Sequence, residues 1–121
     1  MQRHHVALIT NCIEPNTISG PITNLNRKDR IISLVNNLNY LSYKSLFEEI
    51  YVVDPFIKNE KNKLEFGNIL KKNGLVNRNI EYVIFSPRKD TEIEILQKGK
   101  GFSEMAMLID SIIYINKKIS N

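Results

Sequence analysis

Three short apolar runs, separated by stretches of helical periodicity, restrict this chain to a small number of folds. The runs are rich in β-forming residues and span residues 5–13, 50–54 and 80–85. Strands that alternate with helices at this spacing pair in parallel through crossover connections. The pattern therefore predicts a three-layer α/β fold with a Rossmann-like parallel sheet, in strand order 3-2-1 or 2-1-3. We expect one domain over residues 1–121.

The intervening stretches predict three helices. The first begins near residue 23 or 24, with Asn24 or Asn26 as its N-cap. The second covers residues 64–73 and ends at Gly74, where a left-handed residue is expected. The third opens at residues 99–101. The apolar face of the first helix contains Leu25, Ile32, Val35 and Leu38, with Ile31, Leu34 and Leu41 beside them. That of the third helix contains Phe102, Met105, Leu108, Ile109, Ile112 and Ile113.

Composition excludes several classes of protein. The 121 residues are 42% hydrophobic and 25% charged, which is the balance of a globular protein rather than a disordered one. The single cysteine, Cys12, excludes an internal disulfide. Apolar runs such as residues 112–115 are too short to cross a bilayer, and the polar residues 1–5 predict no signal peptide. We therefore expect a cytoplasmic location.

The net charge of +4 suits a phosphate-bearing ligand, an anionic membrane surface or a nucleic acid. The basic residues form small clusters rather than one block, and the tyrosines are scattered through apolar segments. A nucleic-acid surface would instead combine a basic stripe with exposed aromatic side chains. We expect no specific nucleic-acid partner.

Candidate binding residues follow the expected strands, because ligands of open parallel sheets bind beyond the carboxyl ends of the strands. Thr10, Asn11 and Glu14 follow the first run, and Asp54 follows the second. The Asp54 carboxylate could accept hydrogen bonds from a ribose or a nucleobase, or it could simply start the turn at Pro55. Arg30, early in the first helix, could point outward or reach back toward the strand ends.

The segment KGKGFSE, residues 98–104, follows the third strand. Two glycines beside a lysine at a helix start let backbone amides and an ammonium group approach a diphosphate, although a glycine-rich turn would look the same. The adjacent His4 and His5 would point to opposite faces of a strand, and the acids of residues 90–92 are typical of a solvated loop. We expect no metal site in this chain.

Together, these segments resemble the N-terminal nucleotide-binding part of GT-A glycosyltransferases of bacterial capsule and lipopolysaccharide biosynthesis. The resemblance rests on VALITNCIEP, RKDRIISLVNNLNYL, IYVVD, YVIFSP and KGKGFSEMAMLIDSI, and it covers residues 5–118. It implies that the nucleotide is bound by Thr10, Asn11, Glu14, Arg30 and Asp54. It implies further that Lys100, Gly101 and Glu104 border the diphosphate or sugar.

The same resemblance implies a nucleotide-sugar ligand and a divalent cation (Mn or Mg) in a complete enzyme. A cytoplasmic location is compatible with peripheral association with the inner membrane. In GT-A enzymes the metal-binding acidic motif and the acceptor site follow the segments matched here, so we expect an incomplete GT-A domain. The alternative is a non-catalytic nucleotide-binding or interaction module of α/β fold. The wide apolar arc of the third helix predicts a homodimer or a partner chain.

Overall fold

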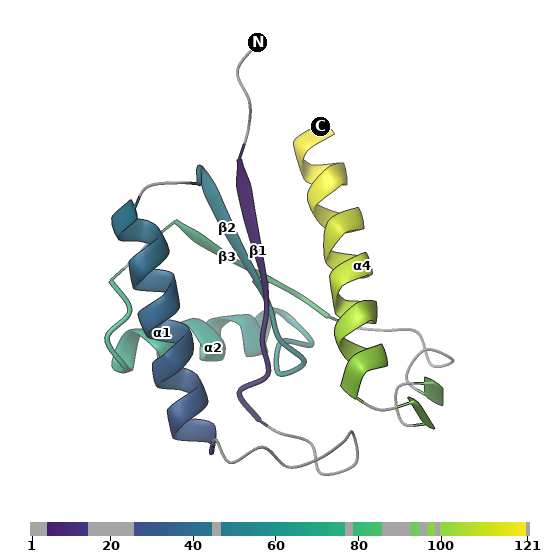
Figure 1. Cartoon of the computed structure of the whole chain (residues 1–121), viewed down its shortest axis with the longest axis horizontal. Coiled ribbons are helices and arrows are strands. Elements are labelled where there is room, and N and C mark those ends of the chain that lie inside the picture. The colour runs from purple at the N-terminus through teal and green to yellow at the C-terminus, as the bar shows by residue number, and fades with distance from the viewer. Residues whose placement is uncertain are drawn as a thin grey trace.

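The computed structural model of this chain contains a small parallel sheet with helices packed on both of its faces (Figure 1). It describes residues 5–14, 26–44, 47–76, 79–85, 93–94, 97–98 and 100–120. The side chains of residues 42, 44, 100–104 and 120 lie outside this description.

The sheet contains strands β1 (Val6–Thr10), β2 (Glu49–Val53) and β3 (Ile80–Val83), in the order β1-β2-β3. Both pairs are parallel, and Ile50 of β2 lies opposite Ala7 on one side and Ile80 on the other. The expected parallel sheet is thus confirmed, in the first of the two orders predicted. Strand β2 has the predicted length and begins one residue earlier, whereas β1 and β3 are shorter than predicted. The chain turns beyond β3, where the Phe85 amide donates to the Ile57 carbonyl in a loop, at 2.8 Å.

The helices begin and end at residues that satisfy their terminal backbone groups. Helix α1 (Arg27–Lys44) follows Asn26, whose side-chain oxygen accepts the Asp29 amide at 2.9 Å. Helix α2 (Glu60–Lys72) begins four residues earlier than predicted, since Asn59 caps it through the Asn62 amide at 2.8 Å. The third helix, α4, spans Lys100–Ser120.

The end of α2 confirms the prediction for Gly74, which has a φ of +100°. The Gly74 amide donates to the Lys71 carbonyl at 3.2 Å, and the Leu75 amide donates to the Leu70 carbonyl at 3.0 Å. These two bonds form a Schellman motif, which requires a left-handed residue at this position.

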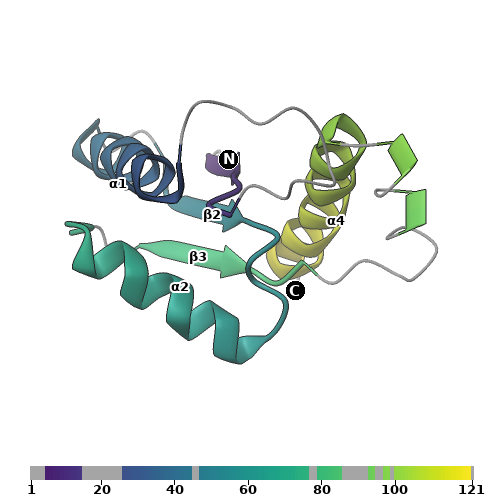
Figure 2. The same cartoon turned by 90° about the horizontal axis from the view of Figure 1, so that it is seen from below.

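Alternate residues of β2 divide the core into two parts. Ile50 and Val52 pack with buried residues of α1 and α2, while Tyr51 and Val53 pack with α4. Figure 2 shows α1 and α2 on one face of the sheet and α4 on the other. Two crossovers that step in the same direction along a sheet place their helices on the same face, so this arrangement follows from the strand order.

The prediction of which helix faces enter the core was wrong in part. The residues of α4 that are buried against the sheet are Met107, Ser111 and Ile115, whereas the predicted apolar face is exposed at Met105, Leu108, Ile109, Ile112 and Ile113. In α1, Val35 and Leu38 of the predicted face are buried, as are the neighbouring Ile31 and Leu34, whereas Ile32 is 38% exposed. Helix α4 is apolar on more than one side, and periodicity alone cannot choose between two apolar sides of one helix.

Polar contacts attach the C-terminal half of α4 to the sheet. Lys118 forms an ion pair with Glu81 of β3, and the Tyr114 hydroxyl donates to the same carboxylate at 2.7 Å. The Lys118 ammonium also lies 5.4 Å from the ring centre of Tyr51. Burial, together with the hydrogen bond to the Glu49 carboxylate and its charge, raises the pKa of Tyr51 to about 12.

In the described part of the chain, no helix has both the length and the apolarity that spanning a membrane requires.

Candidate functional site

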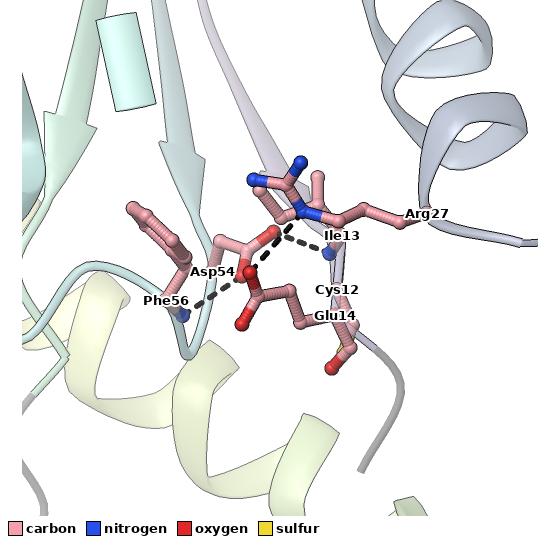
Figure 3. A network of polar contacts seen from close by, with 6 residues as sticks. All are labelled: Cys12, Ile13, Glu14, Arg27, Asp54 and Phe56. Atoms are coloured by element: carbon pink, nitrogen blue, oxygen red, sulfur yellow. Dashed lines mark hydrogen bonds and ion pairs between the residues drawn. The ribbon is translucent and has the colours of Figure 1, made fainter. Parts of the chain in front are cut away.

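Residues 11–14 (the loop after β1) and residues 54–57 (the loop after β2) meet at the carboxyl edge of the sheet, where they are joined by a network of polar contacts (Figure 3). Helices α1 and α4 both begin at this edge, because each runs opposite to the strands (Figure 1). Ligands of open α/β sheets bind at this position.

Asp54 is the centre of the network. It follows the last residue of β2 and is 1% exposed. One carboxylate oxygen accepts the Asn11 side-chain amide and the Ile13 backbone amide, both at 3.0 Å, and the other accepts the Phe56 amide at 2.9 Å. A carboxylate has about four acceptor positions. Asp54 therefore holds the loop after β1 against the loop after β2, using most of its acceptor capacity.

Opposing effects act on the Asp54 carboxyl group. Burial removes water from the charged form and raises its pKa above the usual value of 3.8. The bonds from Phe56, Asn11 and Ile13 lower the pKa, and the nearby negative charge of Glu14 raises it. The net effect is a raised pKa, with desolvation as the largest cause.

Two arginines of α1 contact the loop after β1. The Arg30 guanidinium donates from Nη1 to the Cys12 carbonyl at 2.9 Å, which places this side chain toward the strand ends. Arg27 forms an ion pair with Glu14 at 3.2 Å, and both side chains are about half exposed. Figure 3 shows this pair beside the Asp54 contacts. The first turn of α1 thus brings positive charge to the carboxyl edge.

The structure brings together one group of the predicted site residues. Thr10, Asn11 and Glu14 lie at the end of β1 or directly after it. Asp54 lies directly after β2 and accepts a hydrogen bond from Asn11, and Arg30 of α1 contacts the loop after β1. Lys100, Gly101 and Glu104 lie in the first turns of α4. Their side chains lie outside the description, as do the acids of residues 90–92 in full.

Sequence reasoning missed the roles of Ile13, Phe56 and Arg27 in this network. The Phe56 contact could have been foreseen, since an aspartate before a turn often accepts the amide two residues further on. The amides of Asn11 and Ile13 are 43 and 41 residues away from Asp54 in sequence, so no local pattern indicates them.

No protein-family model matches the chain, and no curated protein or solved structure matches it either. Among the residues that the structure describes, no group of three or more His, Cys, Asp or Glu side chains is arranged to hold a metal ion. What this edge binds must therefore be inferred from its own geometry and charge.

Proposed function

We propose that this chain is the donor-nucleotide-binding part of a GT-A-type glycosyltransferase of surface-polysaccharide biosynthesis. Its ligand is a nucleoside diphosphate or the corresponding nucleotide sugar. The ligand binds at the carboxyl edge of the sheet, between the loop after β1 and the start of α4.

The observation that carries this proposal is the fixed loop after β1. A binding loop must keep one shape if it is to recognise a flat base, and the Asp54 carboxylate fixes this loop through Asn11 and the Ile13 amide. Arg30 fixes the same loop from the other side, through the Cys12 carbonyl. Asp54 is too buried to be a primary ligand contact in this arrangement, so we assign it the role of a positioning residue.

Positive charge near the same edge supports a phosphate-bearing ligand. Arg27 and Arg30 lie in the first turns of α1, and Lys100 begins α4. The N-terminus of a helix adds a partial positive charge and unpaired amides, which favour anions. We propose that the base lies near residues 10–14 and that Lys100 and Gly101 border the diphosphate, with Glu104 beside the sugar.

Calorimetric titration with uridine diphosphate and other nucleoside diphosphates, and with their sugar conjugates, tests this proposal. We expect dissociation constants between about 0.1 and 1 mM, with weakening at higher salt. Lys100→Ala should weaken binding of the diphosphates and reduce the salt dependence. Lys117→Ala is the matched control, because it removes the same charge from the other end of α4.

A second variant separates the base contact from the phosphate contact. Asn11→Ala removes one of the two hydrogen bonds between the loop after β1 and Asp54. It should therefore weaken the binding of nucleosides and of nucleoside diphosphates to the same extent. No detectable binding at millimolar ligand would reject the proposal, and so would equal binding by wild type, Lys100→Ala and Asn11→Ala. Because the resemblance covers only the donor-binding part, we expect binding without measurable sugar transfer by this chain alone.

A further inference from the structure

Helix α4 carries an apolar stripe that faces away from the sheet. Met105, Ile109, Ile112 and Ile119 are 59%, 51%, 44% and 50% exposed, although Met107 and Ile115 of the same helix are buried against the sheet. Contiguous exposed apolar surface of this kind marks interaction sites in folded proteins.

The spacing of the stripe is that of a coiled-coil seam. Its residues are 105, 109, 112, 116 and 119, so the steps alternate between four and three residues, as a and d positions of a heptad do. Asn116 is exposed and occupies an a position within it. Leu108 and Ile113 flank the stripe and are also exposed.

The charged side chains described on α4 avoid this seam. They are Asp110, Lys117 and Lys118, and Lys118 is bound to Glu81 of the sheet. A seam without charged side chains cannot form ion pairs with a nucleic acid or an anionic membrane. It is complementary to a surface that is itself uncharged and apolar. The same seam on a second copy of the chain meets this requirement.

We propose that α4 pairs with α4 of a second copy in a parallel two-stranded coiled coil, related by a two-fold axis. The parallel arrangement places Asn116 opposite Asn116 of the second copy, where each amide can both donate and accept. An antiparallel arrangement would place Asn116 against an apolar side chain such as Met105. This inference is independent of the nucleotide proposal, because no residue of the seam belongs to the candidate site.

The available area is sufficient for a specific dimer. The exposed apolar side chains of the seam and its flanks present roughly 500 Å² on each copy, so a pair would bury about 1,000 Å², where specific interfaces begin. Such a dimer should dissociate on dilution.

Sedimentation of the full chain between about 1 and about 300 µM tests the interface, since weak homodimers dissociate in this range. We expect a reversible monomer–dimer equilibrium. Ile109→Lys and Ile112→Lys should each raise the dissociation constant about thirtyfold or more, because each places a charge in the seam. Leu64→Lys, on an exposed position of α2, is the matched control and should leave the constant unchanged.

Single cysteines test the orientation, in a Cys12→Ser background. In a parallel pair, identical positions of the two copies face one another. Met105→Cys should therefore form a disulfide with Cys at position 105 of a second copy of the same variant, and Ile119→Cys should do the same at position 119. Both variants keep the folded seam largely intact, so they report on it even if the lysine variants fail to fold. A chain that stays monomeric at the highest concentration would overturn the proposal. So would dimers that the lysine variants leave unchanged. Crosslinking of Met105→Cys only when it is mixed with Asn116→Cys, the position that faces it in the antiparallel arrangement, would also overturn the proposal.

Discussion

Asp54 is a buried carboxylate that joins two loops, and its surroundings explain both why it is stable there and what its loss would do. Three donors of the chain point at its two oxygens, and two of them belong to the loop after β1. Without the carboxylate, the buried Ile13 amide would have no acceptor in this position. The shape of the candidate binding loop thus depends on one side chain from a different strand.

Replacing Asp54 by alanine should therefore cost about 2–4 kcal/mol of the free energy of unfolding, because buried donors lose their acceptor. Urea denaturation followed by circular dichroism measures this cost. Glu65→Ala, an exposed acid on α2, should change stability by less than about 0.5 kcal/mol. Equal effects of the two substitutions would show that Asp54 does not hold the loops together.

The raised pKa of Asp54 makes its contribution depend on pH. Between the usual value of 3.8 and the raised value, the folded state keeps a proton that the unfolded state has lost. The contribution of Asp54 to the free energy of unfolding is therefore fully present below about pH 3.8. It decreases as the pH rises through the raised pKa. Asp54→Asn should remove this decrease from the pH profile of the free energy of unfolding.

A carboxyl-carbon NMR titration measures the same pKa directly. Glu14→Gln should lower the Asp54 pKa, because the Glu14 charge is one of the causes that raise it. Asp29→Asn, an exposed acid in the first turn of α1, should leave it unchanged. An Asp54 pKa below 3.8 in the wild-type chain would contradict this account.

Helix α2 contains Gly67 and is followed, one residue beyond its Asn73 cap, by Gly74; these two glycines have opposite requirements. A Cβ atom at Gly67, in the middle of the helix, would lie 3.4 Å from a ring carbon of Tyr82, which is an ordinary contact. Gly74 has open space around it, but its φ of +100° is one that side chains rarely adopt. A side chain at Gly74 would meet no steric obstacle but would be strained by the backbone conformation. A side chain at Gly67 would fit the helical backbone, and its effect depends on the contact with Tyr82.

The same substitution should thus have opposite effects at these positions. Gly67→Ala should stabilise the chain by up to about 1 kcal/mol through helix propensity, and Gly74→Ala should destabilise it by about 1–2 kcal/mol. Thermal denaturation of both variants measures the difference, with each serving as the control for the other. A lower melting temperature for Gly67→Ala would mean that Tyr82 cannot accommodate the methyl group.

At the scale of the whole molecule, the sequence predicted the order of elements, the parallel sheet, the start of α1 and the end of α2. These features depend on local signals: apolar runs, Asn26 as a cap and Gly74 as a left-handed residue. The sequence did not predict which side of α4 meets the sheet, since Ile112 and Ile115 are equally apolar and only the second is buried. Nor did it predict the partners of Asp54, because they are distant along the chain.

The position of β2 between the other two strands has a consequence for the rate at which backbone amides exchange with solvent. Four of its five residues are buried, whereas every residue of β1 is only half-buried and, within the described residues, β1 pairs with β2 alone. Local opening that releases β1 leaves the β2–β3 pair intact, so the amides of β1 should exchange faster than those of β2 in native-state hydrogen exchange. Asn11 and Ile13 continue directly from β1, and their bonds to Asp54 resist that opening. Asp54→Ala should therefore accelerate exchange in β1 more than in β3, and equal acceleration of both strands would show that the sheet opens as one unit.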